Sequence, residues 1–263
     1  MAEPILLYPF RNRIKRGISQ SELMQWLEFL SPDIVKFEED FIQKVDAAAY
    51  RFGSITNGTS AAVTGTVASI ANGICRLTTG TTNNGYAGIF PNFDATLEGA
   101  GYLGDNSDVI LARVRASAIT SLKIEVGFTD SDADAGAVST LATPTCKADD
   151  CAVWCFDTSD TGNPQWQAGY RAAAGTAVAI EPDLTDIAVA TYEWLGVALL
   201  AGNVKFMHAD QYGNPDYESA WYASAITATD LLVPWIFAQT RNTTSKTVDI
   251  DYVIAFLSHL NYL

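Results

Sequence analysis

Side chains that could act as catalytic bases or nucleophiles are few and widely spaced in this sequence. His208 alternates with apolar neighbours, and His259 lies near the C-terminus beside Leu257 and Leu260. Neither a Gly-x-Ser-x-Gly turn nor a Cys/His pairing accompanies them. The sequence therefore predicts no catalytic role for His208, a surface or interface position for His259 and no catalytic residue elsewhere.

The cysteines are too few for a disulfide-rich scaffold. Three of them form a C-x4-C-x3-C run that lacks the two-residue spacing of zinc knuckles and has no histidine nearby. Reduced thiols are the favoured interpretation, and a local disulfide and a structural zinc are the alternatives. The four residues are Cys75, Cys146, Cys151 and Cys155.

The aspartates in residues 130–136 alternate and could present oxygens to a calcium ion. An EF-hand loop needs Gly at its sixth position and Glu at its twelfth, where this chain has Ala135 and Leu141. We expect an acidic solvated turn between strands, with calcium as the alternative. No metal site and no cofactor are predicted.

Aromatic side chains are frequent in the second half of the chain, and exposed rings could stack on sugars. Packing in the core or between subunits is the favoured interpretation, because these segments hold few other large core residues. The set comprises Trp154, Trp166, Tyr170, Trp194, Trp221, Tyr222 and Trp235.

Composition restricts the partners. The 263 residues carry 16 Lys+Arg against 30 Asp+Glu, a net charge of −14 that repels nucleic acid and anionic membranes. No apolar run approaches the length of a membrane span, and the N-terminus does not look like a secretory signal. Only 17% of residues are charged while 48% are apolar, which favours assembly into a homo-oligomer, a dimer or trimer.

The first 34 residues differ from the rest and are predicted to form a docking arm. A capping box at residues 19–22 precedes one apolar stripe on a short helix. Such a helix cannot bury its stripe alone, and the basic cluster before it, which includes Lys15, suits an acidic neighbour. The residues expected to bind a partner are Arg11, Arg13, Arg16, Leu23, Trp26, Leu27 and Leu30.

Residues 35–263 are predicted to form one all-β domain, because short β-branched and aromatic segments alternate with Gly, Asn and Asp clusters. Alternation in residues 109–116 and 122–129 predicts a half-buried antiparallel hairpin. Residues 226–232 suit a helical turn at a sandwich edge. The expected strands are 61–70, 74–78, 86–90, 109–118, 121–129, 152–156, 165–171, 191–200, 203–209 and 247–259.

Three stretches together resemble a family of concanavalin-like sandwich proteins common among tailed-bacteriophage structural genes. They are the acidic opening Phe37–Ile42, the strand–turn–strand Gly73–Ala87, and Ile124–Asp130 paired with the closing strand Val248–Ile254. The resemblance covers roughly residues 36 to 256. It implies a two-sheet antiparallel sandwich of jelly-roll or concanavalin-like type, used as a virion component, with the helical N-terminal arm outside it.

The closing strand is also similar to that of laminarinase-like and agarase-like glycoside hydrolases. Those enzymes carry a Glu-x-Asp-x-x-Glu strand that places carboxylates on one face. The nearest match here is Glu181–Asp186, where Pro182 argues against a central strand. We therefore expect a protein that is not an enzyme.

The predicted function is a capsid decoration (cement) protein that docks through its arm. The expected partners are the major capsid protein or other virion proteins, and the expected location is the virion, assembled in the host cytoplasm. The alternative is a carbohydrate-binding or receptor-binding tail or fibre component, for which a glycan is the partner.

Overall fold

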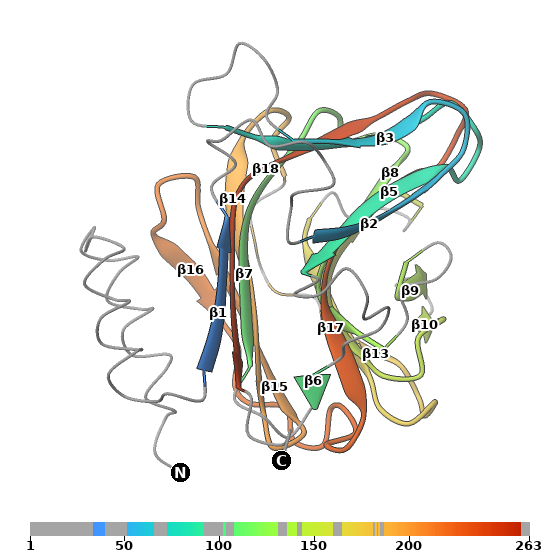
Figure 1. Cartoon of the computed structure of the whole chain (residues 1–263). Coiled ribbons are helices and arrows are strands. Elements are labelled where there is room, and N and C mark those ends of the chain that lie inside the picture. Colours follow the sequence, from blue (N-terminus) through green and yellow to red (C-terminus); the bar gives the residue numbers. More distant parts are fainter. Residues whose placement is uncertain are drawn as a thin grey trace.

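The computed structural model describes residues 34–39, 52–65, 73–91, 102–103, 108–130, 136–140, 144–159, 165–180, 182, 184 and 187–258. Two antiparallel sheets pack face to face in this part of the chain, as Figure 1 shows. All the regular elements of the described residues are strands. Among these residues there is accordingly no helix long and apolar enough to cross a membrane.

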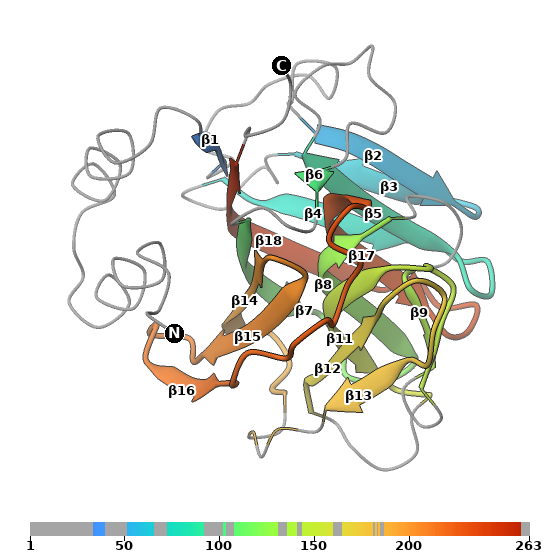
Figure 2. The same cartoon turned by 90° about the horizontal axis from the view of Figure 1, so that it is seen from below.

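The first sheet, sheet 1, runs in the order β16-β15-β14-β7-β18-β4-β3, and β1 also pairs with β18. Figure 2 shows β16 at one edge and β3 toward the other. Its strands are β1 (Ile34–Glu39), β3 (Ala61–Thr64), β4 (Cys75–Thr79), β7 (Val109–Ala116), β14 (Tyr192–Leu200), β15 (Asn203–Ala209), β16 (Pro215–Glu218) and β18 (Thr247–Ser258).

The second sheet, sheet 2, runs in the order β13-β12-β11-β8-β17-β5-β2, and β6 also pairs with β17. Its strands are β2 (Phe52–Asn57), β5 (Tyr86–Pro91), β6 (Tyr102–Leu103), β8 (Leu122–Thr129), β11 (Cys151–Asp157), β12 (Gln167–Arg171), β13 (Val178–Ile180) and β17 (Leu231–Thr240). A small hairpin of β9 (Val138–Thr140) and β10 (Thr145–Cys146) lies outside sheet 2 (Figure 1).

The main core lies between the sheets, where alternate residues of each strand point inward. Ile110 and Val114 of β7 face Ile124 and Val126 of β8 across this layer, and all four are buried. Trp154 of β11 spans the layer: its Nε1 donates to the Gly196 carbonyl oxygen of β14 at 2.9 Å. This hydrogen bond satisfies the one polar atom of a ring that is otherwise packed in apolar surroundings.

The predicted hairpin of β7 and β8 is wrong. β7 pairs with β14 and β18 in sheet 1, whereas β8 pairs with β11 and β17 in sheet 2. Residues 117–121 therefore cross from one sheet to the other. Alternation shows that a strand has two unlike faces, but it does not identify the strand that lies beside it.

The helical turn predicted near residues 226–232 is also wrong. Residues 227–230 form turns, and Leu231 and Leu232 begin β17, which the sequence analysis did not predict. β17 lacks alternation because both of its faces are buried: Ile236 points into the main core and Trp235 into a second apolar cluster. Pro234, which has no amide hydrogen to donate, further obscures the strand.

Candidate functional site

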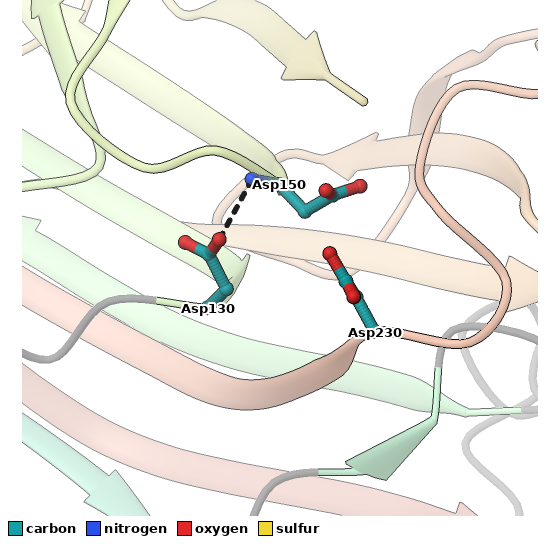
Figure 3. Close-up of side chains that lie close together, drawn as sticks. All are labelled: Asp130, Asp150 and Asp230. Atoms are coloured by element: carbon teal, nitrogen blue, oxygen red, sulfur yellow. Dashed lines mark hydrogen bonds between the residues drawn. The ribbon is translucent and has the colours of Figure 1, made fainter. Parts of the chain in front are cut away.

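Three aspartates gather at one end of sheet 2 (Figure 3). Asp130 follows β8, Asp150 precedes β11 and Asp230 precedes β17, and these strands are neighbours in the sheet. One carboxylate oxygen of each lies within 4.8 Å of the others. The sequence predicted only an acidic turn at Asp130, because its two partners come from distant segments.

Protein donors already surround the innermost aspartate. The buried Asp150 carboxylate accepts hydrogen bonds from the Thr227 amide, the Thr227 hydroxyl at 3.0 Å and the Ala173 amide at 2.8 Å. Its own amide donates to Asp130 Oδ2 at 2.9 Å (Figure 3). Asp150 thus fastens the loops before β11, after β12 and before β17 to one another.

The other two carboxyl groups are affected by the crowding of negative charge. A hydrogen bond with Asp150 raises the pKa of Asp230, and burial raises that of Asp130. A proton on Asp230 can bridge to Asp150, and three hard oxygen donors can also take a calcium ion. Because Asp150 already has protein partners, we interpret the cluster as a set of hydrogen bonds that hold the three loops together.

An Asp230→Asn substitution tests this interpretation. Because its pKa is raised in the folded protein, the contribution of Asp230 to the stability of the fold is lost as the pH rises through that folded pKa. The Asn amide would donate to Asp150 without needing a proton, so we expect the variant to melt at the same or a higher temperature at neutral pH. The measurement is thermal unfolding in chelator and in added calcium.

Asp210→Asn is the matched control for that substitution. Burial alone would raise the pKa of Asp210, but the hydrogen bonds from Asn214 and Tyr212 together outweigh burial and lower this pKa, so the variant should melt lower. A calcium-dependent rise in the wild type that Asp230→Asn removes would contradict the fastening role and establish a metal site.

The outward side of sheet 1 carries a mixed aromatic and charged surface, here called the open face. It is formed by residues whose neighbours along each strand point into the core. Cross-strand register places Trp194 opposite Arg113 and Arg113 opposite Tyr252. The open face comprises Arg76, Arg113, Arg115, Tyr192, Trp194, Asp249, Asp251 and Tyr252, from β4, β7, β14 and β18.

Ion pairs fix the charged groups of the open face. Arg76 binds Asp249 through two nitrogen–oxygen contacts of 2.6 and 2.9 Å, and Arg115 reaches the same carboxylate. Arg113 pairs with Asp251. Burial alone would raise the pKa of Asp249, but the hydrogen bonds from the two arginines outweigh burial and lower it, so this carboxylate is ionised at neutral pH.

The rings of the open face lie among these charges and are only partly buried. The Arg113 guanidinium lies 4.4 Å from the centre of the Tyr192 ring, and the centres of the Trp194 and Tyr252 rings are 5.8 Å apart. Tyr192 Oη and Arg113 Nε are buried and have no hydrogen-bond partner among the described residues. A polar ligand could satisfy both atoms after small side-chain movements.

The outward side of sheet 2 is closed. Residues 136–140 and 144–148, here called the cover segment, pack over Cys151, Val153 and Trp235. Beneath it Lys123 and Glu125 form an ion pair of 2.5 Å in which both side chains are fully buried. The half-buried strand predicted for residues 122–129 is therefore wrong, because both of its faces are buried, and this surface is inaccessible to a large ligand.

His208 is packed in the core. It is 5% exposed between the sheets, with Nδ1 2.5 Å from Asp216 Oδ1 and Nε2 3.0 Å from Glu193 Oε2. Burial alone would lower its pKa, but these two hydrogen bonds raise it to about 9. An imidazolium with both nitrogens occupied fastens the edge strand β16 and is a poor general base.

The aromatic set divides between core and surface. Trp154, Trp166 and Trp235 are buried, which confirms core packing for them. Tyr170 and Tyr222 pack on each other at the core margin, with ring centres 5.4 Å apart. Trp194 and Trp221 stay partly exposed, and of this pair Trp194 belongs to the open face.

Several predicted sites lie outside the described residues. They are the docking arm with Arg11, Arg13, Arg16, Leu23, Trp26, Leu27 and Leu30, together with His259 and all three carboxylates of Glu181–Asp186. All four cysteines are described, and they are thiols.

Solved structures share this architecture at low sequence identity. A Shewanella oneidensis protein of unknown function, SO2946, superposes with a TM-score of 0.59 at 12% identity over 92% of this chain and 95% of that chain. Peanut lectin superposes with a TM-score of 0.55 at 11% identity over 85% of this chain and 97% of that chain. The chain has a concanavalin-like, jelly-roll sandwich fold.

An enzyme is among the solved structures that have this fold. A GH16 protein of the Bacteroides ovatus mixed-linkage glucan locus, solved with a G4G4G3G product, gives a TM-score of 0.51 at 10% identity over 82% of this chain and 98% of that chain. The fold therefore does not support the expectation that the chain is not an enzyme. No protein-family model and no curated protein match the sequence.

Proposed function

We propose that the chain is a carbohydrate-binding protein whose ligand lies on the open face of sheet 1. The observation that carries the proposal is the pair of partly exposed rings, Trp194 and Tyr252, which lie between charged side chains on the outward side of sheet 1. Aromatic ring faces suit the C–H surface of a sugar, and charged groups suit its hydroxyls.

The arrangement of charges supports a sugar over a purely apolar partner. Asp251 supplies an acceptor and Arg113 and Arg115 supply donors, all held by ion pairs within the sheet. Groups that are already fixed lose little conformational freedom when a ligand binds. The occurrence of the fold in lectins and glucan hydrolases agrees with a sugar ligand.

A glycan-binding survey with matched variants tests the proposal. Trp194→Ala removes the central ring, and we expect it to weaken binding by about tenfold or more, as for a residue central to an interface. Arg113→Lys, which keeps the charge but loses the planar fork, should also weaken binding. Tyr212→Ala, at a tyrosine that is 79% exposed in a turn, is the control and should leave affinity unchanged.

Absence of glycan binding, or equal loss in the Tyr212→Ala control, would refute the proposal. If the wild type instead dimerises in solution and Trp194→Ala makes it monomeric, the open face is a subunit interface. Urea unfolding of each variant shows whether a loss of binding reflects a loss of folding.

The virion role stays a separate proposal, which rests on the sequence of the arm and on the low charged fraction of the chain. It is compatible with glycan binding in a tail or fibre component. Cosedimentation with undecorated capsids tests it: full-length chain should bind and a chain beginning at Asp33 should not, whereas no binding by either form contradicts decoration of the capsid.

A further inference from the structure

Two of the four cysteines face each other at the edge of the cover segment. Cys146 ends β10 and Cys151 begins β11, with four residues between them. Cys151 belongs to the second apolar cluster, Cys146 packs against this cluster, and the two side chains are in hydrogen-bonding contact. Two thiols in contact are candidates for a covalent bond.

The backbone around this pair is held on both sides. Lys147 and Ala148 donate their amides to the Ala137 carbonyl oxygen at 2.8 and 3.3 Å. The Arg171 guanidinium donates to the carbonyl oxygens of Cys146 and Ala148 at 3.0 and 2.8 Å. The contact between the sulfurs is therefore fixed in the folded chain, which favours reaction between them over reaction with other thiols.

The two thiols differ in solvent exposure and in pKa. Cys146 is partly exposed, whereas Cys75, Cys151 and Cys155 are buried. The hydrogen bond from Cys151 lowers the pKa of Cys146 and, with Arg171 and Lys123, outweighs the opposite effects of burial and Glu125. The contact and burial raise the pKa of Cys151. Cys146 is thus the thiol that a soluble reagent can meet first and the better source of thiolate.

We propose that Cys146 and Cys151 are a redox-modifiable pair that a small disulfide, such as oxidised glutathione, converts into an intramolecular disulfide. The Cys146 thiolate attacks a glutathione sulfur and releases one glutathione thiolate. Cys151 then gives up its proton and attacks the Cys146 sulfur, which releases the second glutathione. Two protein thiols are oxidised, and one glutathione disulfide is reduced to two thiols.

The bond would fasten the cover segment to sheet 2. In the thiol form, hydrogen bonds from residues 137 and 138 to Glu125 and apolar packing hold this segment. A disulfide adds a covalent link at its far end, next to β11. The closed surface of sheet 2 would then open less readily under oxidising conditions than under reducing ones.

Peptide mapping of the full chain tests the proposal. Trypsin cleaves after Lys123, Lys147 and Arg171, so Cys146 lies in one peptide and both Cys151 and Cys155 lie in the next. After equilibration of native protein with oxidised and reduced glutathione, we expect these two peptides to be linked, and we expect reduction to separate them.

Variants assign the bond. Cys155→Ala should keep the linked peptides, and Cys146→Ser should abolish them. Cys151→Ser should instead accumulate a single glutathione on Cys146, because the second step is blocked. Four thiols after equilibration, a link that survives Cys146→Ser, or a link that forms only in urea would overturn the proposal.

Discussion

Replacing Glu125 by Ala is expected to destabilise the fold by about 3–5 kcal/mol, the cost of leaving one partner of a buried ion pair alone. Glu125 pairs with Lys123, and both side chains are fully buried. Its carboxylate also accepts from the amides of Ala137 and Val138 at 2.7 and 2.9 Å and from Trp235 Nε1 at 2.9 Å. The substitution therefore leaves one buried cation and three hydrogen-bond donors without their acceptor.

A double-mutant cycle measured by urea unfolding checks this prediction. Lys123→Met alone leaves the carboxylate without its cation, Glu125→Gln alone leaves the ammonium group without its anion, and the double variant removes both charges. We expect the double variant to lose less than the two single losses added together, because neither charge is then left alone. Additive losses, or a cost below about 1 kcal/mol for Glu125→Ala, would show that solvent reaches the pair.

The stability of the fold is expected to decrease as the pH rises through the range in which His208 titrates. The folded pKa of about 9 lies above the unfolded value of 6.5. Such a group contributes its full stability below pH 6.5, and the contribution is lost as the pH rises through about 9. The difference in pKa corresponds to roughly 3 kcal/mol.

The matched variant for this prediction is His208→Gln, which can still hydrogen-bond but does not titrate. Urea unfolding at a series of pH values should show the wild type losing its advantage over the variant between neutral and alkaline pH. A constant difference across that range would mean that His208 is neutral in the folded protein. The titration of its ring protons by NMR would then show a pKa near or below the ordinary value.

Alternation and turn residues located many strands but not their partners. The predicted strand 203–209 matches β15 in full, and 247–259 matches β18 to within one residue. The half-buried strand predicted for residues 122–129 was wrong, because the cover segment also buries the side chains of Lys123 and Glu125 on its outward face. Pairing and cover depend on contacts between distant residues, which periodicity does not encode.

The candidate sites depend on the same distant contacts. Trp194 was identified as a ring that could bind sugar, but its neighbours Arg113 and Tyr252 come from other strands. The aspartate cluster was missed except for Asp130, since it joins residues that are 20 and 100 positions apart in sequence. The cysteine spacing left a local disulfide open, and the contact between Cys146 and Cys151 now singles out one pair.

The most direct test of glycan binding on the open face is to map amide chemical-shift changes by NMR while a binding glycan is added. We predict changes concentrated in β7, β14 and β18, around Arg113, Trp194 and Tyr252. Changes confined to the loops around Asp130, Asp150 and Asp230, with the open face unaffected, would contradict the account and place the ligand at the aspartate cluster.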